Sequence, residues 1–173
     1  PSDAVALFVD RATAVGWTVE AEHLDQVADV CRKLDGVALA IELAAARLPA
    51  LGLDGLVVGL SDHLRLLVGG HRADDRHRSV RAMLDWSQAL LRGPDLTLLR
   101  RVSVFVSPFT ASAAAEAAGF PPLEPGAVVD ALARLADQSL LTAAPSADGT
   151  RYRALETIRQ YAIEQLVETG ELD

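Results

Sequence analysis

The longest apolar pattern of the chain runs from Val27 to Leu48 and predicts two consecutive helices. The apolar residues of the first helix recur at i, i+3, i+4 and i+7, and they are Val27, Val30, Cys31 and Leu34. Gly36 ends this helix, because glycine adopts the left-handed conformation of a C-cap without steric cost. From Val37 to Leu48 nearly every residue is apolar, with Glu42 and Arg47 as the charges, so we expect a helix that is buried on most sides.

Most of the remaining chain also follows a helical pattern. Further helices are predicted from Ser2 or Asp3 to about Val15, over 54–60, 62–67 and 79–90, from Pro94 onwards, and over 110–119, 126–138 and 156–168. The run 102–106 is rich in β-branched residues and predicts a short strand. Residues 139–143 and 151–154 flank the turn signal Asp148-Gly149, which predicts a β-hairpin.

The order of these elements predicts two domains. Residues 69–77 begin with two glycines, carry mixed charges and have no apolar period, which is typical of a linker. We therefore expect a helical domain over 1–70, a linker over 71–77 and a winged-helix domain over 78–173, because three helices followed by a hairpin is the winged-helix order. The fold class is mainly α, a helical bundle followed by a winged helix with a small β-hairpin. The alternative is a shared core, with Trp86 packed against the first domain.

Several segments resemble one known family. The run 32–47, Arg-Lys-Leu-Asp-Gly-Val-Ala-Leu-Ala-Ile-Glu-Leu-Ala-Ala-Ala-Arg, is similar to the segment that follows the ATPase core in signal-transduction ATPases with numerous domains. These include the NB-ARC proteins and bacterial LuxR-like or antibiotic-regulatory transcriptional activators. Residues 78–87, 98–105 and 152–162 resemble the winged helix of those activators.

The resemblance implies a nucleotide contact in a larger parent protein. The family motif Gly-Leu-Pro-Leu-Ala corresponds here to Gly36-Val37-Ala38-Leu39-Ala40, with alanine in place of the proline that packs on adenine. It implies that Gly36, Val37, Ala38 and Glu42 help to enclose ADP or ATP. The implied partners are a nucleotide-binding core and an output domain of the parent chain, with an oligomer possible on activation.

The composition excludes several kinds of chemistry. The net charge of −8 and the pI near 4.9 oppose broad nucleic-acid binding, and the lone Cys31 excludes a disulfide within the chain and a Cys-rich zinc site. Lys33, the single lysine, lacks the context of a phosphate-binding loop, so we expect no tight binding of ADP or ATP by this chain alone and no enzymatic activity. His23, His63, His71 and His77 have no metal-ligand spacing. The absence of a long apolar run predicts a cytoplasmic protein without a membrane partner.

Three charged features each allow more than one interpretation. Glu42 either pairs with Arg47 or another arginine, or lies beside a nucleotide. The arginine-rich window 76–101 is a solvated face, a surface that docks on the ATPase core, or a DNA contact. The predicted recognition helix, 127–138, carries only Arg134 against Asp130 and Asp137, so we do not expect it to read DNA.

These patterns favour a non-enzymatic role. The main interpretation is a regulatory fragment of a multidomain signalling ATPase and transcriptional regulator that relays nucleotide state to an output domain. The alternative is a winged-helix module that binds DNA or protein by itself.

Overall fold

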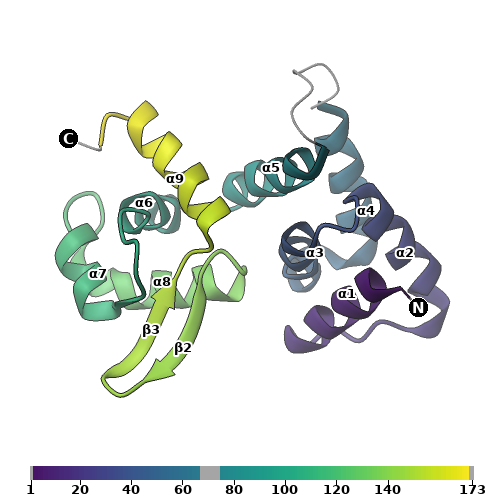
Figure 1. Ribbon diagram of the computed structural model, residues 1–173, viewed down its shortest axis with the longest axis horizontal. Coiled ribbons are helices and arrows are strands. Elements are labelled where there is room, and N and C mark those ends of the chain that lie inside the picture. The colour runs from purple at the N-terminus through teal and green to yellow at the C-terminus, as the bar shows by residue number, and fades with distance from the viewer. Residues whose placement is uncertain (1, 67–74, 172–173) are drawn as a thin grey trace. The chain divides into compact units, whose positions relative to one another are not determined.

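The computed structural model describes residues 2–66 and 75–171. Its contacts divide the chain into two compact units, unit 1 at 1–89 and unit 2 at 90–173 (Figure 1). The division falls after the fifth helix, further along the chain than the predicted linker at 71–77. Residues 71–74 of that linker lie outside the described residues, and 75–77 form the first turn of a helix.

Unit 1 consists of helices in its described residues. They are α1 (Asp3–Ala14), the short 3-10 helix η1 (Ala21–His23), α2 (Leu24–Lys33), α3 (Ala38–Ala45), α4 (Leu48–Leu66) and α5 (Asp75–Ala89). Ser2 caps α1 by accepting a hydrogen bond from the Val5 amide at 3.3 Å, as its side chain predicts. The core side of α1 carries Val5, Phe8 and Ala12, and the helix packs against α2 and α3.

The two helices predicted over 27–48 are confirmed in their main features. All four residues of the α2 stripe are buried, and Gly36 has a φ of +68°. Five of the eight residues of α3 are buried, among them Ala44 and Ala45 with no exposed surface. The second helix ends at Ala45 rather than Leu48, and Leu48 begins α4.

Helix α4 differs from the two short helices that the sequence predicts. Its backbone breaks at Gly52, where φ is +68° and ψ is 172°, and then continues as a helix to Leu66. The helix passes through Gly59 without a break, because the ring of Trp86 lies directly against that glycine. Tertiary packing here overrides the low helix propensity of glycine.

Helix α5 belongs to unit 1 by its contacts, and Trp86 packs there against α4. Trp86 is 6% exposed and lies against Gly59 of α4, and its ring stacks on that of His63 with 5.1 Å between centroids. Ser79 Oγ donates a hydrogen bond of 2.8 Å to Asp35 Oδ2 in the α2–α3 loop. The apolar face of α5 therefore completes the core of unit 1.

Unit 2 has the element order of a winged helix. Its elements are α6 (Gly93–Val102), β1 (Phe109–Thr110), α7 (Ala111–Ala118), η2 (Pro125–Ala127), α8 (Val128–Asp137), β2 (Thr142–Ser146), β3 (Gly149–Arg153) and α9 (Glu156–Glu168). Helix α6 packs against α7, α8 and α9, and the strands form an antiparallel sheet in the order β1-β3-β2 (Figure 1). The predicted fold class, mainly α with a small sheet, is confirmed.

The strands deviate from their predicted positions. The predicted strand at 102–106 is wrong, because Val102 is the last residue of α6 and β1 forms at Phe109, which pairs with Tyr152. The hairpin is confirmed but shifted, since Leu140 and Leu141 are buried before β2 begins and Pro145 pairs with Thr150 inside the ladder. Proline is tolerated there because β2 is an edge strand.

Helical spacing over 126–138 and 79–90 predicts that Val129 and Leu90 face inward, and both are exposed instead. Val129 is 54% exposed on α8, where Ala131 takes the buried position, and Leu90 is 47% exposed after the end of α5. The apolar spacing i, i+4 and i+8 over 156–168 predicts that Ile158, Ala162 and Leu166 face inward, and all three are buried in α9.

Within residues 2–66 and 75–171, no single helix is both long and apolar enough to cross a membrane. The helices Ala38–Ala45 and Leu48–His63 together reach the length and apolar composition of a membrane span, but they are bent by 117° relative to each other.

Candidate interaction surface of the winged-helix unit

The single arginine of α8 is held by a buried carboxylate. Asp95 lies in the first turn of α6 with its side chain 4% exposed, and Arg134 donates to both of its oxygens: Nε at 3.1 and 2.9 Å and Nη2 at 2.7 Å. This hydrogen bonding raises the pKa of Arg134 further above its ordinary value. The guanidinium therefore links α8 to α6, and the side chain stabilises the packing of these two helices.

The solvent-facing side of α8 is acidic and apolar. Asp130, Ala133 and Asp137 are exposed beside Val129. Side chains that read base edges in a major groove are mostly Arg, Lys, Asn and Gln, none of which lies on this side. We call the four exposed residues the α8 face.

The hairpin of β2 and β3 forms a wing whose tip is closed by an ion pair. Arg151 Nη2 lies 2.7 Å from Asp148 Oδ2, and Ser146 Oγ donates to Asp148 Oδ1 at 2.6 Å. These bonds, above all that from Arg151, lower the pKa of Asp148 to about 2. Arg153, at the end of β3, is exposed, and no hydrogen bond or ion pair engages its side chain within the described part of the chain.

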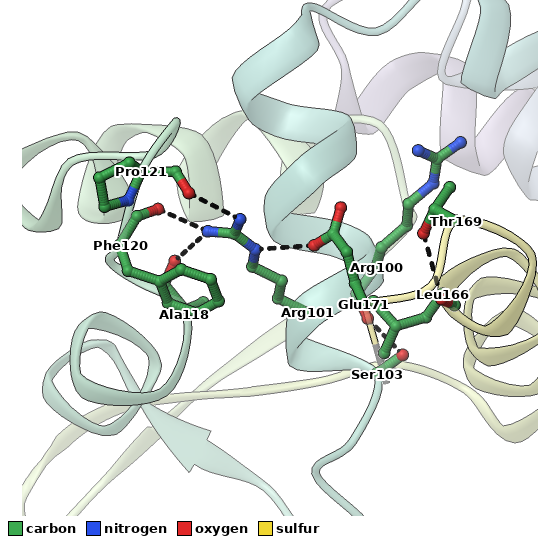
Figure 2. Close-up of polar contacts among 9 residues, drawn as sticks. All are labelled: Arg100, Arg101, Ser103, Ala118, Phe120, Pro121, Leu166, Thr169 and Glu171. Atoms are coloured by element: carbon green, nitrogen blue, oxygen red, sulfur yellow. Dashed lines mark hydrogen bonds and ion pairs between the residues drawn. The ribbon is translucent and has the colours of Figure 1, made fainter. Parts of the chain in front are cut away.

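A second arginine, Arg101 of α6, binds the loop between α7 and α8. Its side chain donates to the carbonyls of Ala118 at 3.0 Å, Phe120 at 2.6 Å and Pro121 at 3.1 Å, as Figure 2 shows. Its Nε donates to Glu171 Oε2 at 3.1 Å, and the guanidinium carbon lies 3.6 Å from the centre of the Phe120 ring. The loop between α7 and α8 and the segment after α9 are thus tied to the same side chain.

The neighbouring contacts at this end of α6 are local. Ser103 Oγ donates to the Arg100 carbonyl, and Thr169 Oγ1 donates to the Leu166 carbonyl (Figure 2). In the described part of the predicted arginine-rich window, Arg101 is buried in structural contacts and Arg100 Nε donates to Gln165 Oε1 at 3.3 Å. The side chains of Arg76 and Arg78 lie outside the described residues.

The residues predicted to contact a nucleotide lie in unit 1 at the start of α3. Asp35 and Gly36 have positive φ angles of 58° and 68°, Val37 is the N-cap and Ala38 is the first residue of the helix. Gly36 and Ala38 are exposed, and Val37 and Glu42 are partly buried. The hydrogen bond from Ser79 to Asp35 holds this loop against α5.

The predicted ion pair between Glu42 and Arg47 does not form. Arg47 Nη2 instead donates to the Ser87 carbonyl in α5 at 2.8 Å, and Glu42 has no ion-pair partner among the described residues. Arg47 lies beyond the end of α3 at Ala45, and even on a continuous helix side chains five residues apart would not face each other. Burial lowers the pKa of Arg47 to about 10.

The remaining candidate groups have structural surroundings. Cys31 is buried in the α2 stripe, where burial raises the pKa of its thiol. Within the described residues no three His, Cys, Asp or Glu side chains are grouped to hold a metal ion. Of the four histidines, His63 has a ring contact, with Trp86, and His71 lies outside the described residues.

The pair of Asp95 and Arg134 is absent from the sequence-based prediction. The residues are 39 positions apart, and only the α6–α8 packing brings them together. The sequence offers no local signal for this pair, because both helices carry other charges as well, Arg100 and Arg101 in α6 and Asp130 and Asp137 in α8.

Comparison with known proteins supports the winged-helix assignment. Residues 91–167 match a family model described as a winged helix-turn-helix domain, and this range begins one residue after the start of unit 2. Residues 91–167 are therefore similar to a winged helix-turn-helix domain, in agreement with the element order of unit 2. No solved structure matches the chain significantly.

Relatives among known proteins match nearly the whole chain. A Mycobacterium tuberculosis protein, provisionally named as an HTH-type transcriptional regulator, is 44% identical over 174 residues, which are 99% of this chain and 20% of that protein. A second M. tuberculosis protein, named only as uncharacterized, is 39% identical over 176 residues, which are 99% of this chain and 45% of that protein. The chain thus spans a fifth and just under half, respectively, of these two relatives.

Proposed function

We propose that this chain is a regulatory module of a larger cytoplasmic transcription regulator, in which the winged helix contacts another protein domain through the α8 face. The family model and the relative named as a regulator support the assignment to transcription regulation. That the chain matches only a fifth of this relative supports its role as one module among several.

One observation carries the choice of a protein partner. Asp95 binds the only arginine of α8 through both carboxylate oxygens, so that the α8 face presents Val129 together with the acidic side chains Asp130 and Asp137. Duplex DNA would meet negative charge there, and phosphate contacts dominate affinity for DNA. A protein surface with basic side chains around an apolar position fits this face.

The test places a photo-cross-linking amino acid at Val129 in the full-length parent protein. We expect adducts with protein. A control at Val106, which is 79% exposed, reports the adducts that exposure alone produces. Adducts with DNA at Val129, or the same adducts at both positions, would overturn the proposal.

DNA binding is the second candidate function. The family model and the name of the relative favour it, and Arg153 offers one exposed cation on the wing. Fluorescence anisotropy with duplex DNA tests it in the 173-residue chain. Micromolar affinity at 0.15 M salt, falling with a log–log slope of several phosphate contacts and weakened by Arg153→Gln, would establish this function.

A finer proposal concerns nucleotide state. The resemblance of 32–47 to the segment after an ATPase core supports a role in which Gly36, Val37, Ala38 and Glu42 help to enclose ADP or ATP held by another domain of the parent. Glu42→Gln in the full-length protein should then change the ADP dissociation rate, whereas the exposed control Glu116→Gln should not. Equal rates in both variants would refute it.

A further inference from the structure

Helix α9 ends in a turn that directs Glu171 back toward α6. Gly170 adopts a left-handed φ of +75°, which favours glycine after the end of a helix. The amides of Gly170 and Glu171 donate to the carbonyls of Val167 at 3.1 Å and Leu166 at 3.0 Å, which is the Schellman arrangement. These bonds fix the backbone of Glu171, and its carboxylate accepts a hydrogen bond of 3.1 Å from Arg101 Nε (Figure 2).

The two side chains of this ion pair are held to different degrees. The side chain of Arg101 is 6% exposed, and its Nη1 and Nη2 atoms donate to the carbonyls of Ala118, Phe120 and Pro121. The side chain of Glu171 is 35% exposed, and Arg101 is its only hydrogen-bond or ion-pair partner in the described part of the chain. Glu171 is therefore the partner of Arg101 that can withdraw without disrupting a buried segment.

Withdrawal of Glu171 would leave the charge of Arg101 without a counter-charge. Among residues 2–66 and 75–171, Glu171 is the only carboxylate that forms an ion pair with this guanidinium. A buried cation that loses its anionic partner is unfavourable, and neutral carbonyls do not replace the charge. We expect the guanidinium to turn toward water in that case, which weakens its hydrogen bonds to the loop between α7 and α8.

The loop bound by Arg101 leads directly into α8. Leu123 is 1% exposed in this loop, η2 follows at Pro125–Ala127, and α8 begins at Val128. Val129, the apolar residue at the start of the α8 face, lies in the first turn of that helix. The conformation of the loop therefore affects the end of α8 that presents Val129.

We propose that the ion pair of Arg101 with Glu171 is a releasable latch, through which the segment after α9 regulates the α8 face. With Glu171 bound, Arg101 holds the loop before α8; with Glu171 withdrawn, the loop loosens. Coupling between two sites is reciprocal, so a change in the loop also alters the end of α9. This inference rests on the proposed function of the α8 face, but the latch itself is measured without a partner.

Amide hydrogen exchange in the 173-residue chain, followed by NMR, tests the latch from the side of α9. Glu171→Gln should speed exchange of the Gly170 amide at the end of α9. It should also speed exchange of the Leu123 amide, which donates to the Phe120 carbonyl at 2.9 Å, by roughly fivefold. The control Glu168→Gln removes an exposed carboxylate from the last turn of α9 and should leave the Leu123 amide unchanged.

Phe120→Leu tests the latch from the side of the loop. Phe120 is 49% exposed, and the substitution removes the ring whose centre lies 3.6 Å from the guanidinium carbon of Arg101. It should speed exchange of the Glu171 amide by roughly twofold or more, whereas the control Glu124→Gln, at an exposed position of the same loop, should not.

The latch is overturned if Glu171→Gln leaves the Leu123 amide as it is in Glu168→Gln, or if Phe120→Leu leaves the Glu171 amide as it is in Glu124→Gln. Either result would mean that the ion pair stabilises only its own end. Cross-linking at Val129 measures the protein contact separately, so failure of the latch and failure of the proposed function are distinguishable.

Discussion

The ring of Trp86 occupies the space that a side chain at Gly59 would need. A Cβ built on Gly59 lies 2.3 Å from Cζ2 of Trp86, a distance that no real contact reaches. We expect Gly59→Ala to destabilise unit 1 by about 1–3 kcal/mol, because the rigid, buried indole and α4 must separate, although alanine favours the helix by up to about 1 kcal/mol. Chemical denaturation measures the loss.

Gly93→Ala is the matched control for this change. Gly93 is also helical, and a Cβ there meets nothing within 4 Å. Its free energy of unfolding should stay within about 0.5 kcal/mol of that of the unaltered chain. Equal free energies of unfolding in Gly59→Ala and Gly93→Ala would show that Trp86 does not pack on α4 as described.

Overpacking at Ala45 should also destabilise unit 1. Ala45 has no exposed surface in α3, so Ala45→Phe should cost roughly 1–3 kcal/mol or more, measured as a lower Tm. Ala50→Phe, at an exposed position of α4, controls for the size of the ring. An unchanged Tm in Ala45→Phe would remove α3 from the centre of the core.

The sequence predicts the fold best where the information is local. The α2 stripe and the buried positions of α9 follow directly from helical periodicity. The run 102–106 misleads because β-branched residues suggest a strand, whereas Leu98, Leu99 and Val102 share a buried side of α6 and extend that helix. Contacts between distant segments, such as Asp95 with Arg134, have no local signal.

The same distinction applies to the domain boundary and to the candidate site. A Gly-Gly pair with mixed charges is a sound local signal for a linker, but the packing of Trp86 on Gly59 determines which unit contains α5. The sequence correctly shows that α8 carries one arginine. It does not show that this arginine is already bound by a carboxylate, which is the feature on which the proposed protein contact rests.

The wing carries a measurable pH response. The folded-state pKa of Asp148 is lowered from 3.8 to about 2, chiefly by Arg151, so any stabilisation from this pair is complete above about pH 4 and is lost as the pH falls through 2. Carboxyl-carbon NMR should give a titration midpoint near 2. Arg151→Gln should raise that midpoint toward 3.8, and the remote variant Arg32→Gln should leave it unchanged.

ADP and ATP should bind this chain weakly or not at all. Lys33, its only lysine, donates to Ser61 Oγ at 3.0 Å and lies outside any phosphate-binding loop, and Ala38 replaces the proline of the family motif. Isothermal titration should give no micromolar affinity for either nucleotide. Micromolar binding would mean that unit 1 or unit 2 recognises nucleotides without a P-loop.

Truncated chains distinguish a domain boundary at the predicted linker, 71–77, from a boundary after Ala89. If α5 completes unit 1, residues 1–90 and 90–173 should each unfold cooperatively as separate proteins, because each keeps its own core. Residues 1–74 should then lose cooperative unfolding, since they lack Met83, Leu84 and Trp86, which are 0–6% exposed in the chain. Calorimetry and near-ultraviolet circular dichroism measure both properties.

The linker predicted at 71–77 requires the opposite result. In that case residues 1–74 would fold, and residues 78–173 would be more stable than 90–173, because α5 would contribute to the winged helix. The deciding comparison is the free energy of unfolding of 78–173 against that of 90–173. Equal free energies of unfolding, together with a folded 1–90 and an unfolded 1–74, place the boundary after Ala89, since α5 packs mainly against α3 and α4 among the described residues.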